Sequence, residues 1–60
     1  MTADVNTVKE MAEKIALIRK EALELKTMSG GNQSVDRNVD RILSSVKMLE
    51  INITDAAEIL

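Results

Sequence analysis

The feature that most constrains this chain is an unbroken heptad pattern over residues 35–60. Its apolar residues follow one another at steps of four and three: Val35, Val39, Ile42, Val46, Leu49, Ile53, Ala56 and Leu60. This spacing puts one apolar stripe along a helix and is typical of a helix that packs lengthwise against another. Residues 49–54 alternate like a strand, but they lie inside the heptad without a flanking Pro or Gly, so the longer period predicts helix.

The first half of the chain carries a second stripe of the same kind. Its members are Val8, Met11, Ile15, Ile18, Ala22 and Leu25. The pattern breaks at Gly30 and Gly31, and Gly30 suits the left-handed position that ends many helices. We therefore expect a helix over about residues 3–28, a turn over about 29–33 and a second helix over about 34–58.

Short polar side chains indicate where the two helices begin. Thr2 is a candidate N-cap of the first helix, and Thr7 with Glu10 matches the capping box. Because the apolar stripe extends back to Val5, we expect Thr7 to lie inside the helix. Ser34 is the expected N-cap of the second helix.

The short connection makes the two helices antiparallel neighbours. If the turn centres on Asn32, facing residues have numbers that sum to about 64. The expected pairs are Leu25–Val39, Ala22–Ile42, Ile18–Val46, Ile15–Leu49, Met11–Ile53 and Val8–Ala56. The sequence therefore predicts an all-α fold, in which residues 1–60 form a single antiparallel helical hairpin. This pairing assigns both stripes to contacts within the chain.

Charged residues support the same register. Glu21 and Glu24 are expected near Arg41 and Arg37, and Lys26 is expected near Asp36. Exposed pairs of this kind contribute roughly 0–1 kcal/mol each, so they favour the register more than they stabilise the fold.

A hairpin of 60 residues has little core, and the chain has neither Cys nor His for disulfides or a structural metal. Self-association is the remaining ordinary source of stability, and a homodimeric four-helix bundle is the expected assembly. One flank of the hairpin carries apolar residues beside the stripe, which suits a second contact. The expected dimer interface consists of Val5, Ala12, Ala16, Leu23, Leu43 and Ala57.

Three large apolar residues occupy outward positions where charged residues would be usual. They are Leu17, Met48 and Ile51. Single exposed aliphatic residues are common on protein surfaces. The functional alternative is a patch that docks a helix or groove of another protein.

Composition argues against several functions. A triad needs a base such as His, and structural zinc needs Cys or His, so we expect no catalytic residue, no metal site and no cofactor. Net charge −2 and the absence of aromatic residues argue against a general nucleic-acid partner. No apolar run reaches membrane-spanning length, and no leader pattern opens the chain, so we expect a cytoplasmic protein.

The favoured function is therefore a small non-enzymatic protein-interaction module, an adaptor, chaperone or regulator. Its expected partners are a second copy of itself and another protein. A basic set, Arg37, Arg41 and Lys47, leaves a second possibility, because the expected architecture is similar to that of the Rop-type RNA-binding hairpin dimers. Asp36 and Asp40 interrupt this basic set.

A third possibility rests on residues 15–23, Ile-Ala-Leu-Ile-Arg-Lys-Glu-Ala-Leu. This run resembles the first helix of the Spo0E-type aspartyl-phosphate phosphatases, which are also short helical hairpins. The hallmark of their second helix is Ser-Gln-Glu-Leu-Asp, and residues 36–40 of this chain share only its last residue, Asp40. The resemblance implies dephosphorylation of response regulators, with Asp40 as the residue that carries it.

Overall fold

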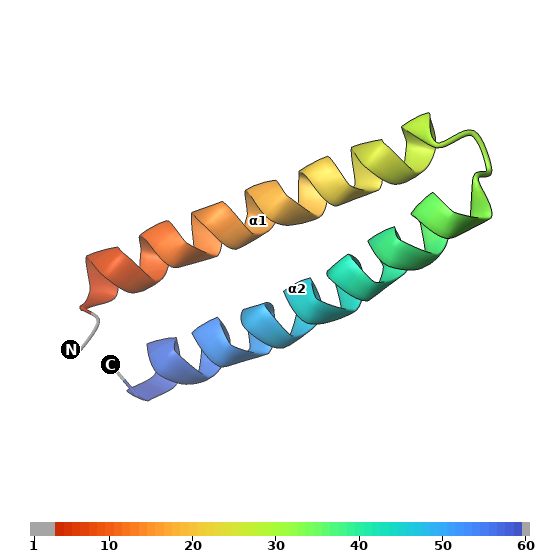
Figure 1. Cartoon of the computed structure of the whole chain (residues 1–60). Helices are drawn as coiled ribbons and strands as arrows, with labels where there is room; N and C mark the ends of the chain where they lie inside the picture. The colour runs from red at the N-terminus through yellow and green to blue at the C-terminus, as the bar shows by residue number, and fades with distance from the viewer. Residues whose placement is uncertain (1–3, 60) are drawn as a thin grey trace.

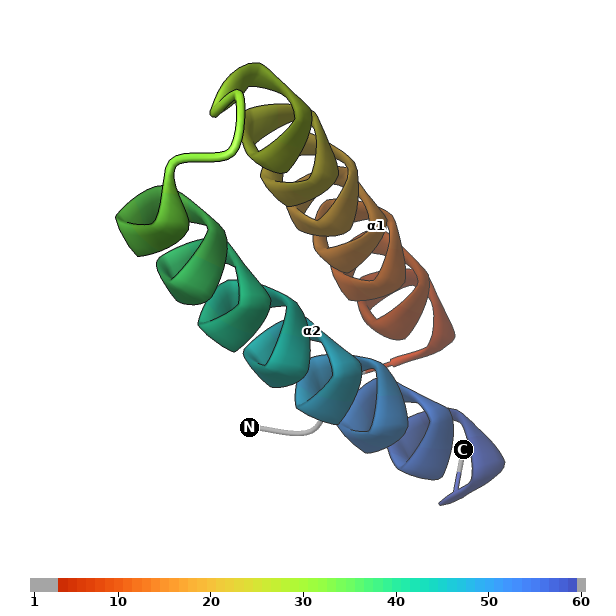
Figure 2. The ribbon, with the colours of Figure 1, turned by 90° about the vertical axis from the view of Figure 1, so that its right-hand side faces the viewer.

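Two long helices packed side by side make up the structure, a computed structural model that describes residues 4–59, with side chains described for residues 4–55. α1 spans Val5–Met28 and α2 spans Gln33–Ile59, and they run antiparallel in both views (Figures 1 and 2). The molecule is elongated, 42 × 17 × 15 Å. The start of α1 and the end of α2 lie together, opposite the turn (Figure 1). The predicted all-α hairpin is confirmed.

α1 begins at Val5 because Asp4 caps it. Asp4 has extended backbone geometry, and its carboxylate accepts a hydrogen bond of 2.8 Å from the backbone N–H of Thr7. The expected start near residue 3 and the candidate cap Thr2 lie outside the described residues. Thr7 lies inside the helix, as expected. Asp4 was not among the caps predicted from the sequence, although Asp caps helices as well as Ser or Thr.

The cap makes the beginning of α1 sensitive to acid. The hydrogen bond from the Thr7 N–H is the main cause that lowers the pKa of Asp4 below its ordinary value of 3.8. The cap is therefore fully effective above pH 3.8 and is lost as the pH falls through the lower pKa of the folded state. We expect the Thr7 amide resonance to titrate with this carboxyl group. In Asp4→Asn, which keeps an acceptor without a charge, that titration should be absent.

The turn is formed by the two glycines, as the sequence predicts. Ser29 is the C-cap of α1, and its backbone N–H bonds the Leu25 carbonyl at 3.0 Å. Gly30 and Gly31 then adopt positive φ angles of 62° and 89°. The left-handed role of Gly30 is confirmed.

α2 begins one residue earlier than expected, because its cap is Asn32 and not Ser34. The Asn32 side-chain oxygen accepts from the Val35 N–H at 3.1 Å, and its backbone carbonyl accepts from the Asp36 N–H at 2.9 Å. Ser34 lies within the first helical turn. Asn is at least as good an N-cap as Ser, so the residue that directly follows the two glycines takes the position.

Gly30→Ala tests the turn. Nothing lies within 4 Å of a Cβ at this position, so the cost should come from the positive φ alone. We expect a loss of about 1 kcal/mol in the free energy of unfolding, measured by urea denaturation. Gly30→Asn should recover most of that loss, because Asn tolerates the left-handed region. Equal stability of Gly30→Ala and the wild type would show that this turn conformation is not required.

The core is one row of side chains from each helix. Among residues 4–55 the buried apolar residues are Val8, Ile15 and Ala22 on α1 and Val39 and Val46 on α2. They repeat at steps of seven. Each apolar stripe consists of two such rows, and these residues belong to one of them. Val39 and Val46 are only 1% exposed, so the tightest packing lies between the middle of the hairpin and the turn.

The second row of each stripe differs from expectation. The pairing predicted that both rows are used within the chain, but one member of each described pair remains 36–46% exposed: Leu25, Ile42, Ile18, Leu49 and Met11. Their buried or half-buried partners are Val39, Ala22, Val46, Ile15 and Ile53. The pair Val8–Ala56 ends outside the described side chains. In this hairpin the two helices contact each other along the first row, so the second row stays partly exposed unless another layer covers it.

Candidate interaction faces

The exposed second row forms one face of the hairpin. Each of its residues follows a buried residue of its own helix by three positions, which is a rotation of about 60° to one side. Because the helices are antiparallel neighbours, equal rotations on α1 and α2 point to the same face. We name this surface the seam face; it consists of Met11, Ile18 and Leu25 from α1 and Ile42 and Leu49 from α2.

A shallow groove opens on the seam face at the end away from the turn. Its volume is about 510 Å³. The lining residues are Thr7, Glu10, Met11, Lys14, Ile15, Leu49, Asn52 and Ile53. The groove shows that the α1 and α2 side chains of this face do not close over the core residue Ile15. Aliphatic side chains of a second layer could fill it.

On the opposite face, ion pairs connect the two helices. We name it the ion-pair face, because Arg19 pairs with Glu50 and Lys26 with Asp40 across it, the latter with 2.7 Å between Nζ and Oδ1. Arg19 and Glu50 follow the buried Ile15 and Val46 by four positions, about 40° to the other side. Each ion pair joins α1 to α2, so polar contacts bridge the two helices on this face.

The dimer interface expected from the sequence falls on the ion-pair face. A groove of about 210 Å³ there is lined by Ala12, Ile15, Ala16, Glu50, Ile53 and Thr54. Leu23 and Val5 are 46% and 66% exposed, and Leu43 is half-buried. The side chain of Ala57 lies outside the described part of the chain. The structure gathers the described members on one face, but it does not test whether a second copy binds them.

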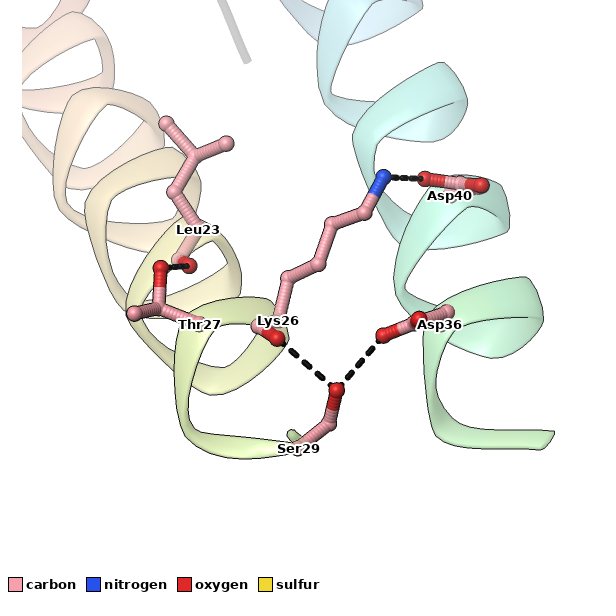
Figure 3. Close-up of polar contacts among 6 residues, drawn as sticks. All are labelled: Leu23, Lys26, Thr27, Ser29, Asp36 and Asp40. Carbon is pink, nitrogen blue, oxygen red and sulfur yellow. Dashed lines mark hydrogen bonds and ion pairs between the residues drawn. The ribbon is translucent and has the colours of Figure 1, made fainter. Parts of the chain in front are cut away.

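Polar contacts at the turn hold the two helix ends together (Figure 3). The Ser29 hydroxyl lies 2.6 Å from the Asp36 carboxylate and 2.8 Å from the Lys26 carbonyl oxygen. The hydrogen bond from Lys26 to Asp40 is the main cause that raises the pKa of Lys26 above its ordinary 10.5, and the charge of Asp36 adds to it. Lys26 therefore lies near Asp36, as the register predicted, but it bonds Asp40.

The other predicted charge pairs are replaced. Within residues 4–55, the ion pairs closer than 4.0 Å join Arg19 to Glu50 and Lys26 to Asp40, and neither Glu21 nor Glu24 pairs with an arginine. Glu21 lies on the seam-face side of α1, whereas Arg19 makes its ion pair on the ion-pair face. Sequence spacing did not predict which long side chains meet.

The three residues of the expected partner patch are exposed but do not form a single patch. Leu17, Met48 and Ile51 are 51%, 57% and 45% exposed. Leu17 follows the buried Ile15 by two positions, which turns it about 200° away from α2, and Met48 turns away from α1 in the same manner. Leu17 therefore lies on the outer side of α1, and the other two lie on the outer side of α2. A groove of about 290 Å³ near Ile51 belongs to α2 alone.

Residues named for catalysis or RNA binding also lie on α2. Asp40 is held in its ion pair with Lys26, and Arg37, Arg41 and Lys47 are exposed. In the part of the chain that the structure describes, no three His, Cys, Asp or Glu residues are close enough together to hold a metal ion. These positions add no argument for phosphatase chemistry or RNA binding, and both remain predictions.

The fold defines the chain as an all-α helical hairpin. Comparisons with known proteins do not assign it to a narrower class. No protein-family model, curated protein or solved structure matches the chain. Within residues 4–59, neither helix is apolar enough over its length to cross a membrane.

The seam face is the feature that the sequence reasoning missed. Its five residues were all recognised as members of the stripes, but they were assigned to contacts within the chain. The spacing alone did not reveal it, because a stripe of two rows is also the seam that two helices of a coiled coil pack against each other. The exposure of the second row in the structure is what identifies the seam face.

Proposed function

We propose that the protein is a small non-enzymatic interaction module that works as a homodimeric four-helix bundle. The seam face carries this proposal: five large aliphatic side chains, each 36–46% exposed, lie on one side of a single helical layer. A contiguous apolar surface of this kind on a small soluble chain marks an interaction site. A second hairpin supplies the missing layer with side chains of the same size and spacing.

The limited core of the hairpin favours a second copy. Buried apolar residues are confined, within residues 4–55, to five positions, of which Ala22 is small. Domains near this size have small cores, and many are stabilised by cross-links, metals or additional subunits. The chain contains no Cys or His to provide the first two. Packing two seam faces together would bury ten aliphatic side chains that one hairpin leaves half-exposed.

We place the dimer contact on the seam face, in preference to the flank expected from the sequence. Burying the ion-pair face would take the Arg19–Glu50 and Lys26–Asp40 pairs out of water, and the desolvation penalty of such pairs can exceed their attraction. The centre of the seam face carries no charged residue. The flank residues, together with the outward Leu17, Met48 and Ile51, would then remain available for a different protein.

Sedimentation equilibrium of the wild type tests the proposal. We expect a stable species of twice the 6.6 kDa chain mass at micromolar concentration. The melting temperature should also rise with protein concentration, because association stabilises the folded state by mass action. A folded monomer would exclude the homodimer. A poorly folded monomer would indicate that a different protein chain must complete the bundle.

Ala16→Glu tests the choice of face. Ala16 is exposed and lines the groove on the ion-pair face. The variant should therefore sediment as a dimer, and its free energy of unfolding should lie within about 1 kcal/mol of the wild-type value. Loss of the dimer in this variant would place the contact on the flank that the sequence predicted, and the seam face would then lose its assigned role.

A further inference from the structure

We propose that the two copies pack through their seam faces in an anti orientation, with the turn of each hairpin against the open end of the other. This inference rests on the homodimer proposed above and specifies its symmetry. In the alternative, syn orientation, both turns lie at the same end and α1 packs on α2 of the second copy. In the anti orientation α1 packs on α1 and α2 on α2, and both pairs are antiparallel.

The first argument is that the seam face is symmetric about its own middle. On α1, Met11 and Leu25 lie seven residues on either side of Ile18. On α2, Ile42 and Leu49 lie on either side of a point next to Val46, the residue that the sequence pairs with Ile18 across the hairpin. A two-fold axis through this point therefore sets Met11 against Leu25 of the second copy and Ile42 against its Leu49. Every aliphatic residue of the face meets another one.

The second argument is the size of the side chains in successive layers. Ile15 and Leu49 form a large layer, whereas the layer of Ala22 and Ile42 on the other side of the middle is small. The anti orientation packs the large layer of one copy on the small layer of the other, which evens out the volume of the core. The syn orientation packs each layer on its own copy, so that one layer holds both Ala22 residues and another holds four large side chains. Close-packed interiors disfavour the void that this would leave.

The third argument is the charge at the two ends of the hairpin. Residues 19–45, the half nearer the turn, carry five basic and four acidic side chains, a formal net charge of +1. The remaining residues carry three basic and six acidic side chains, a formal net charge of −3. The syn orientation places the two acidic ends side by side, whereas the anti orientation places each beside the positive half of the other copy. Like charges brought together oppose association.

The charged residues at the edge of the seam face favour neither the anti nor the syn orientation. The anti orientation brings Lys14 close to Glu21 of the second copy, but the syn orientation brings Arg41 close to the same glutamate. Each orientation therefore gains two exposed pairs, which contribute little. Layer volume and end charge both favour anti, and they decide the orientation.

Distance measurement between spin labels tests the inference. The chain has no Cys, so Gln33→Cys places a single nitroxide per copy on an exposed position at the turn. In the anti dimer the two labels should lie roughly 40 Å apart, since the rise is about 1.5 Å per residue along some 26 residues. In the syn dimer they should lie only a bundle width apart, about 20 Å. A label at Lys20→Cys, near the middle of the hairpin, should give a short distance in both orientations.

The possible outcomes separate the two proposals. A long distance from position 33 with a short one from position 20 supports the anti orientation. Short distances from both positions overturn it and leave the homodimer intact. No dipolar signal from either label, with sedimentation as a monomer, overturns the homodimer itself.

Discussion

Ile18→Glu is expected to abolish self-association at concentrations where the wild type is a dimer. Ile18 is 44% exposed in the single hairpin, so a glutamate there keeps access to water and the chain loses little as a monomer. In the anti dimer the two copies of residue 18 lie at the two-fold axis, where both carboxylates would be buried beside each other. An uncompensated buried charge costs at least about 3 kcal/mol, so the dissociation constant should rise by roughly a hundredfold or more.

Leu17→Glu is the matched control, because Leu17 is the neighbouring residue and is 51% exposed. The two variants share the same change in charge and nearly the same exposure, and they differ in the face that they alter. Leu17→Glu should sediment as a dimer. If both variants associate as the wild type does, the seam face is not the contact surface.

Ile15→Ala is expected to cost about 3 kcal/mol in the free energy of unfolding. Ile15 is 8% exposed and lies in the row of α1 that faces α2, and removing a large aliphatic side chain from such a site costs about 2–5 kcal/mol. The cost should be near the upper end of that range if the groove on the seam face is also covered by a second copy, because the cavity is then enclosed on all sides. Urea denaturation at one fixed protein concentration measures it.

Leu17→Ala provides the comparison within the same helical turn. Leu17 points away from α2, so its truncation should change the free energy of unfolding by no more than about 0.5 kcal/mol. Similar losses in the two variants would mean that the row of Val8, Ile15 and Ala22 is not the core.

The hairpin could be predicted because its determinants are local and repetitive. The heptad steps, the two glycines and the short connection each follow from helix geometry, and the structure contains the two packed helices that they predict. The helix caps were predicted less well, because Asp4 and Asn32 compete with nearby Thr7 and Ser34 for the same role. Ser, Thr, Asp and Asn have similar capping preferences, so the choice depends on which residue adopts extended backbone geometry.

The faces could be predicted only in part, since exposure depends on the number of layers. The spacing identifies Ile18 and Leu49 as apolar stripe residues, but it does not say whether one helix or two cover them. Long charged side chains are harder still, because Arg19 and Lys26 reach across a face to residues that simple register does not pair with them. Residues Leu17 and Met48 were correctly expected to be exposed, yet only the three-dimensional arrangement places them on opposite sides of the hairpin.

The most direct test of the seam-face dimer is a nuclear Overhauser experiment on mixed dimers of one ¹³C-methyl-labelled and one unlabelled chain. Filtering selects contacts between the two copies. We predict intermolecular contacts from the methyl groups of the seam face, with Ile18 and Leu49 among the strongest, and none from Leu17, Met48 or Ile51. Intermolecular contacts confined to Ala12, Ala16 and Leu23, or none at all in a folded chain, would contradict the proposed seam-face dimer.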